Sequence, residues 1–152
     1  MIQRRGYALA KPEEVADVAS RLRPEDYVEG FALRGVDLTY WIPENYTPGN
    51  TYVIFNDRNE NVALTGVEPV SKDEGLIWMV ATPDLEKHGL EFLRACHEFI
   101  DIMCRPYKKV GNVVHARNEV HLKWLKWLGF EFKGEAPLGP LHETFIHFEK
   151  VM

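Results

Sequence analysis

The run ARNEVHLKWLKWLGFEF, residues 116–132, constrains the fold more than any other stretch of the chain. Asn118 stands where a helix would begin, and its side chain is suited to accept a hydrogen bond from a backbone N–H of the first turn. Gly129 stands where that helix would end, because glycine tolerates the positive φ of a C-terminal cap. The residues between them predict a wide apolar helix face at Val120, Trp124, Leu125, Trp127 and Leu128.

Three strand candidates follow one another in the middle of the chain, at residues 51–57, 60–70 and 75–82. Turn residues at 56–59 separate the first two and predict a hairpin. The third candidate is apolar almost throughout, which predicts a central strand buried on both faces.

Helices are predicted on either side of this strand group. Residues 11–22 and 23–35 each have a proline near the start, acidic residues in the first turn and apolar residues at helical spacing. Residues 85–104 carry another apolar stripe. Segment 37–50, which is rich in aromatic residues and punctuated by Pro and Gly, is predicted to be an irregular connection.

The remaining strands are short. They are expected at residues 3–9 and 110–116, and an alternating pair at 130–136 and 143–151 ends the sequence. This order of elements predicts a single α/β domain over residues 1–152, with a mixed, mostly antiparallel central sheet and helices on both faces.

Charge and apolar content exclude several classes of function. There are 18 basic and 23 acidic residues, a net charge of −5, which argues against nucleic acid as the primary partner. No apolar run approaches the roughly 18 residues of a membrane span, and the first residues lack the apolar core of a signal peptide. We therefore expect a soluble, cytoplasmic protein.

Cysteines and histidines form no metal-binding pattern. Cys96 and Cys104 would lie about 12 Å apart along one helix, too far for a disulfide, and are predicted to be buried free thiols. The histidine spacings do not match a zinc site either, because nine residues separate His88 from His97 and His147 would face away from His142. The sequence predicts no metal site.

The element order and the run 116–132 together resemble the GCN5-related N-acetyltransferase (GNAT) family. The late helix of that family often has Asn, then a small residue, then Tyr, and then Gly-Phe at its end. Here Asn118 opens the helix and Gly129-Phe130 closes it at the expected spacing. More narrowly, RPEDYVEG, IWMVATPDL and HLKWLKWLGFEF resemble GNAT-like proteins of short-tailed bacteriophages, some of which are named internal virion proteins or acetyltransferases.

This resemblance implies acetyl-coenzyme A as the cofactor, in a splay between the fourth and fifth strands. The pantetheine arm would pair with strand backbone, and the pyrophosphate would face the next helix start, where backbone N–H groups bind anions. Of the family's glycine-rich signature at that helix start, only Gly89 is present. The implied cofactor contacts are Met79, Val80, Ala81, Thr82, Lys87, His88, Gly89, Leu90 and Asn118.

The resemblance also implies two candidate catalytic residues. Glu68 lies near where some family members carry a Glu that deprotonates the amine, and His121 is the chemical alternative near a helix start. A Tyr that protonates the leaving thiolate in many GNAT enzymes is replaced here by Leu125. The competing explanations are an exposed Glu at a strand end and a His that only hydrogen-bonds near the helix cap.

Three functions stay open on these grounds. The first is an N-acyltransferase that moves an acetyl group from acetyl-coenzyme A to an amine of unknown identity. The second is a phage virion or assembly protein that uses a degenerate GNAT scaffold, and the third is a host-takeover binding protein. The partner would then be a phage or host protein or a second copy of the chain, and the location would be the host cytoplasm or the virion.

Overall fold

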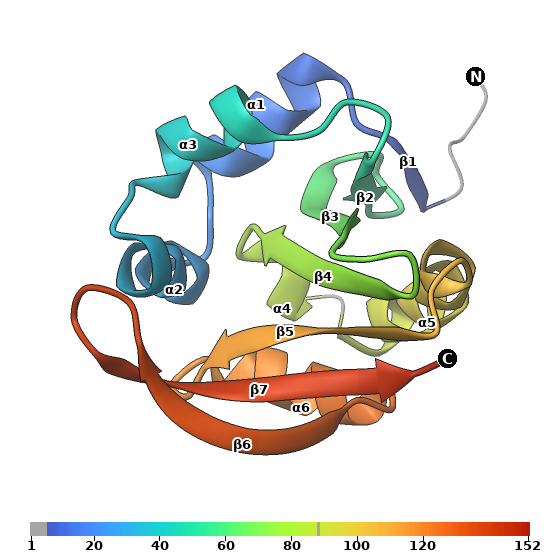
Figure 1. Cartoon of the computed structure of the whole chain (residues 1–152). Helices are drawn as coiled ribbons and strands as arrows, with labels where there is room; N and C mark the ends of the chain where they lie inside the picture. The colour runs from blue at the N-terminus through green and yellow to red at the C-terminus, as the bar shows by residue number, and fades with distance from the viewer. Residues whose placement is uncertain (1–5, 88) are drawn as a thin grey trace.

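The computed structural model describes residues 6–87 and 89–152, with the backbone alone for residues 89–95. Its strands form one seven-stranded sheet in the order β1-β2-β3-β4-β5-β7-β6 (Figure 1). Only the β4–β5 pair is parallel, so the sheet is mixed and mostly antiparallel, and β4 is its central strand. The strands are β1 Tyr7–Leu9, β2 Thr51–Phe55, β3 Asn61–Pro69, β4 Glu74–Ala81, β5 Lys109–His115, β6 Glu131–Leu138 and β7 Glu143–Val151.

Helices cover both faces of the sheet, as predicted. Along β2, Val53 and Phe55 pack against α1 and α3, whereas Ile54 packs against the α5 and α6 side, because successive strand residues point to opposite faces. In the described part of the chain no helix is long and apolar enough to cross a bilayer. The helices are α1 Pro12–Ser20, α2 Pro24–Arg34, α3 Leu38–Asn45, α4 Asp84–Lys87, α5 Gly89–Cys104 and α6 Glu119–Trp127.

The prediction of an irregular connection over residues 37–50 is wrong, because α3 occupies its first half. The Asp37 side chain caps the helix by accepting from Thr39 N–H at 3.0 Å. Leu38 and Ile42 lie one turn apart and are both buried. Pro43 removes one helix hydrogen bond, but the burial of these two side chains holds the helix together.

Helix α6 confirms most of what its sequence predicted. Gly129 has φ +92° just past the helix end, and Trp124 and Leu128 are buried. Trp127 was expected on the buried face and is instead 47% exposed. The predicted cap at Asn118 is also wrong, because its side chain makes no capping hydrogen bond and turns toward α2 instead.

The sheet opens between β4 and β5. These strands pair only at their N-terminal ends, where Glu74, Gly75 and Leu76 face residues 109–111. At the point of separation the side-chain amide of Asn112 donates to Ile77 O at 2.8 Å. Beyond it, β5 keeps pairing with β7 up to His115, so the C-terminal half of β4 diverges from β5.

Candidate functional site

The N-terminal half of α2 bridges the two diverging strands. Arg23 N–H donates to Ala81 O at 2.8 Å, and the Asp26 carboxylate accepts from Ala81 N–H at 2.9 Å. Three residues further along α2, the Glu29 carboxylate accepts from His115 N–H at 2.5 Å. The last residue of β4 and the last residue of β5 are therefore both hydrogen-bonded to one helix.

A buried ion pair fixes the start of this helix. The guanidinium Nη1 of Arg23 lies 3.2 Å from Asp26 Oδ1, and both side chains are fully enclosed. Nη2 of the same guanidinium contacts the more exposed acids Glu25, at 3.5 Å, and Glu86, at 3.3 Å. Charged groups are seldom buried unless they are paired and hydrogen-bonded, and this pair meets that condition.

Asn118 joins α6 to the same cluster. Its amide nitrogen lies 3.1 Å from Asp26 Oδ1 and 3.4 Å from Glu29 Oε2, and its amide oxygen accepts from Arg23 at 3.5 Å. The side chain is 1% exposed. The ion pair of Arg23 and Asp26 explains why Asn118 does not cap α6, since hydrogen bonds to ionised groups are stronger than those to a backbone amide.

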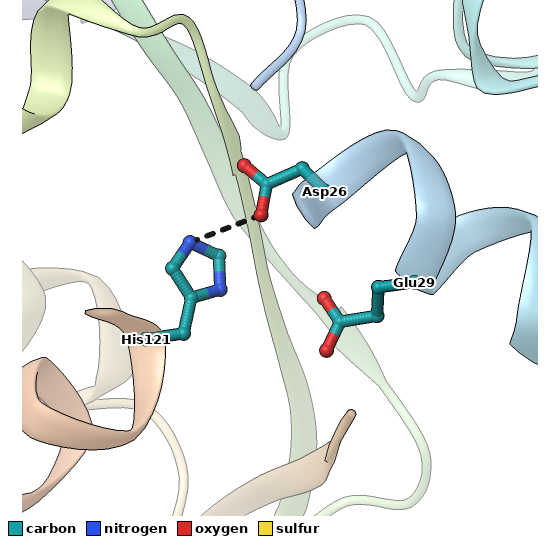
Figure 2. A group of neighbouring side chains, drawn as sticks. All are labelled: Asp26, Glu29 and His121. Carbon is teal, nitrogen blue, oxygen red and sulfur yellow. Dashed lines mark ion pairs between the residues drawn. The ribbon is translucent and has the colours of Figure 1, made fainter. Parts of the chain in front are cut away.

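His121, one turn into α6, faces the carboxylates (Figure 2). Its Nε2 lies 3.3 Å from Asp26 Oδ1, and burial lowers the pKa of the imidazole, although the Asp26 carboxylate opposes part of the shift. Burial raises the pKa of Glu29 to about 8, against the hydrogen bond from His115 N–H. At neutral pH both groups therefore favour their uncharged forms.

A cleft of about 270 Å³ opens in the splay beside this cluster. One wall is apolar and comes from α2 and α3, and the opposite wall comes from α6, because the sheet is open between them. Asn112 and Thr65 add polar groups to the lining. The ionisable residues that line the cleft are Asp26, Glu29, Arg34, Tyr46, Glu68 and His121. A mostly apolar cleft with a few convergent titratable groups is the usual form of a small-molecule site.

The structure brings several predicted site residues to this cleft. Glu68, half-buried in β3, and His121 both line it, as do Met79 and Val80. Leu125, in the slot of the family Tyr, also lines it. Their catalytic and binding roles stay predictions.

The predicted pyrophosphate segment lies at α4 and the start of α5. Lys87 ends α4, is exposed, and pairs with Asp84 at 3.5 Å. His88 lies outside the described residues. Gly89 and Leu90 open α5, where the structure describes the backbone alone. The short helix α4 includes the start of the helix predicted over residues 85–104, and it brings the acids Asp84 and Glu86 close to Arg21 and Arg23.

The backbone of β4 tests whether coenzyme A fits the splay. Thr82 N–H donates to Val62 O in β3, and alternate residues of an antiparallel strand turn to the same neighbour, so Ala81, Met79 and Ile77 turn toward β5. Both backbone groups of Ala81 are engaged by α2, and Ile77 O accepts from Asn112. Met79 alone presents its backbone to the cleft, so these residues do not fit the pairing implied for a pantetheine arm.

The sequence reasoning missed Arg23, Asp26 and Glu29. Acids near a helix start are common, because they favour the positive end of the helix dipole, and they were interpreted that way. A signal was nevertheless present, since these three residues recur every third position and therefore share one helix face. Their partners are 55 to 95 residues distant along the chain, beyond the reach of local patterns.

Comparison with sequence families gives one partial match. Residues 71–136, less than half of the chain, match the family model described as "Bacteriophage T7, probable scaffold protein Gp13". The matched segment begins just before β4 and ends within β6, so it includes the splay and α6. No curated protein sequence matches the chain.

Solved structures of N-acetyltransferases share the fold. The GNAT-family acetyltransferase from Bacillus anthracis superposes with a TM-score of 0.69 at 12% identity, over 97% of this chain and 92% of that one. The ribosomal-protein-S5-alanine acetyltransferase from Vibrio fischeri gives 0.65 at 16% identity, over 99% and 95%. A chimeric spermidine N-acetyltransferase from Vibrio cholerae gives 0.55 at 10% identity, and this chain spans only 66% of its length. The chain therefore has a GNAT-like fold.

Proposed function

We propose that this chain is a phage assembly or virion protein that uses the GNAT-like fold as a binding scaffold and does not transfer acetyl groups from coenzyme A. The observation that carries the proposal is the bridge made by α2. Arg23 and Asp26 take both outward backbone groups of Ala81, and Glu29 takes His115 N–H. Apart from Met79, the strand edge on which the resemblance places the pantetheine arm is thus hydrogen-bonded within the protein itself.

The region expected to bind the pyrophosphate of coenzyme A also supports the proposal that this cofactor is not used. Asp84 and Glu86 lie in α4, and Glu25 lies beside Glu86 around Arg23. Arg23 is the one buried cation among the side chains that the structure describes, and it is shared among Asp26, Glu25 and Glu86, so its charge is already balanced by acids. Carboxylates at this place repel a phosphate group.

The phage role rests on the partial match of residues 71–136 to the T7 scaffold-protein family and on the three stretches that resemble proteins of short-tailed phages. Both signals include the IWMVATPDL run of β4 and α4. In this proposal the partner is another phage protein, and the chain works in the host cytoplasm during assembly or inside the particle.

N-acyl transfer is the second candidate, and the cleft favours it. Glu68 and His121 line the same cleft as Glu29, whose pKa of about 8 suits a group that gives or takes a proton near neutrality. In this alternative Glu68 or His121 would take the proton from the amine of the acceptor. The acyl donor would have to reach the cleft by another path than the edge of β4 that α2 covers.

Calorimetric titration of acetyl-coenzyme A separates the two candidates. We expect no saturable heat at millimolar ligand from the wild-type protein. Saturable binding together with acetylation of an amine such as spermidine or an N-terminal alanine peptide would refute the proposal and favour the enzyme. In that case Glu68→Gln should lower turnover mainly at low pH.

The assembly role has its own test. Mass spectrometry should find the chain in purified phage particles or in assembly intermediates. A phage that lacks the gene should fail to form infectious particles, and Glu68→Gln should restore them as well as the wild-type chain does. Absence of the chain from particles and intermediates alike, or failure of a folded Glu68→Gln variant to restore assembly, would count against a binding role.

A further inference from the structure

Three side chains with metal-ligating atoms converge at one wall of the cleft. Asp26 and Glu29 come from α2 and His121 comes from α6, and Figure 2 shows the imidazole facing the two carboxylates, with its ion pair to Asp26 drawn as a dashed line. One ligating atom from each lies within 4.8 Å of the others. The 3.3 Å between Asp26 Oδ1 and His121 Nε2 is close to the separation of two neighbouring ligands that each lie about 2.1 Å from one ion.

The imidazole of His121 supplies an independent indication of a ligand. The residue is 7% exposed, and among the described residues its Nε2 has no hydrogen-bond partner of acceptable geometry. Buried polar atoms in proteins almost always have a partner, and a buried neutral imidazole is the form that binds metals. Nε2 lies 3.3 Å from Asp26 Oδ1, but the orientation of the two groups does not make a hydrogen bond.

The local charge also favours a cation. Asp26 is completely buried and Glu29 is half-buried, whereas Arg23 divides its single positive charge among three acids. A divalent ion would balance the Asp26 carboxylate and would bind Glu29 in its deprotonated form, since metal ligands bind without their protons. Buried carboxylates without enough positive charge are costly, and metal coordination is one of the ways in which proteins compensate them.

The surrounding hydrogen bonds resemble those that hold metal ligands in place. The amide of Asn118 donates to both carboxylates, Ala81 N–H holds Asp26 Oδ2, and His115 N–H holds Glu29 Oε1. Donors of this kind orient ligating carboxylates around metal ions. The Arg23 contact to Asp26 Oδ1 belongs to this outer group, since a carboxylate oxygen can accept more than one donor.

We propose that Asp26, Glu29 and His121 bind one divalent transition-metal ion, of the Zn²⁺ or Mn²⁺ type, on the wall of the cleft. One imidazole nitrogen and two carboxylate oxygens suit these ions better than Ca²⁺ or Mg²⁺, which prefer oxygen ligands alone. All three residues line the cleft, so the remaining coordination positions face it. A water molecule or an anionic group of a ligand would fill them. This site does not depend on the function proposed above.

Calorimetry on chelator-treated full-length protein tests the site, with ZnCl₂ and MnCl₂ as probes. We expect one ion per chain, bound with micromolar or tighter affinity. Substitutions His121→Gln and Glu29→Gln should each weaken binding at least tenfold, the scale at which even outer partners of metal sites act. The matched control is His97→Gln, because His97 is exposed on α5 beside Asp101, and it should leave the affinity unchanged.

A spectroscopic measurement covers the case in which the variants do not fold. The wild-type protein loaded with Co²⁺ should show weak visible ligand-field bands of nitrogen and oxygen ligation without the strong sulfur charge-transfer band that Cys96 or Cys104 would produce. Absence of saturable heat from both ions, wild-type affinity in folded His121→Gln and Glu29→Gln proteins, or a sulfur charge-transfer band would each overturn the proposal. The acetyl-coenzyme A titration has no bearing on any of these outcomes.

Discussion

Removal of the Arg23 charge should weaken the attachment of α2 across the splay. Substitution Arg23→Met keeps the length of the side chain and the Arg23 N–H bond to Ala81 O, but it leaves the fully buried Asp26 without its cation. Loss of one partner of a buried pair costs about 3–5 kcal/mol. Asp26 retains Ala81 N–H and the amide of Asn118, so we expect a loss of about 3 kcal/mol of unfolding free energy.

Urea unfolding followed by tryptophan fluorescence and circular dichroism measures this loss, in buffer with a chelator. Arg21→Met is the matched control, because Arg21 makes a 2.8 Å ion pair with Asp17 in which both side chains are about 40% exposed. Exposed pairs contribute at most about 1 kcal/mol. The double variant Arg23→Met/Asp26→Asn removes both charges and keeps an acceptor for Ala81 N–H, so it should be more stable than Arg23→Met alone.

Two results would refute the reasoning. The first is an Arg23→Met protein within about 1 kcal/mol of the wild type, which would mean that the buried pair does not anchor α2. The second is strict additivity of the two single changes in the double variant, since residues in direct contact should show a coupling energy.

Three further predictions concern other parts of the fold. The pKa of Glu29 is about 8 in the folded state and near 4.5 in the unfolded state, so the folded state binds the proton more tightly and its stability falls as pH rises between these values. Urea unfolding with a chelator should show Glu29→Gln gaining about 4 kcal/mol on the wild type from pH 5 to pH 8.5, because each pKa unit corresponds to about 1.4 kcal/mol. A pH-independent difference would contradict this. Gly139→Ala should lower the free energy of unfolding by about 2–4 kcal/mol, because φ is +76° and a Cβ there would overlap the backbone of α2. The control Gly49→Ala, where φ is +83° and the space is open, should lower it by about 1 kcal/mol. Equal losses would be inconsistent with the packing of the β6–β7 loop on α2. Burial raises the pKa of Cys96 and Cys104 to about 12. A chromogenic thiol reagent at pH 8 should therefore react with neither thiol until urea unfolds the protein. Rapid reaction of the native chain would show that α5 is not packed as described.

Part of the candidate site could be located from the sequence, but the buried polar residues Arg23, Asp26 and Glu29 could not. Glu68, His121, Met79 and Val80 were predicted and line the cleft. They were found because they stand at recognisable positions in strands and helices of a known type of fold. The residues that close the splay were missed, because nothing in a helix with an acidic first turn shows which strand ends it will meet.

Patterns among residues close together in the sequence predict most of the helices and strands. Period-two and helical patterns placed the sheet strands and α6, and a single glycine with positive φ placed the end of that helix, because these signals depend on neighbours a few residues away. Helix α3 was not predicted from such patterns, since Pro43 lowers the helix propensity of this segment. The burial of Leu38 and Ile42 against residues distant in the sequence stabilises the helix nevertheless.

Asn118 shows most clearly where local information ends. By sequence it is an N-cap for α6, and its place in the chain is that of an N-cap. Its hydrogen bonds go instead to Arg23, Asp26 and Glu29, which lie 89 to 95 residues earlier. Folding brings the ion pair of Arg23 and Asp26 beside it in a buried place, and there an ionised partner binds an amide more strongly than the backbone of its own helix does.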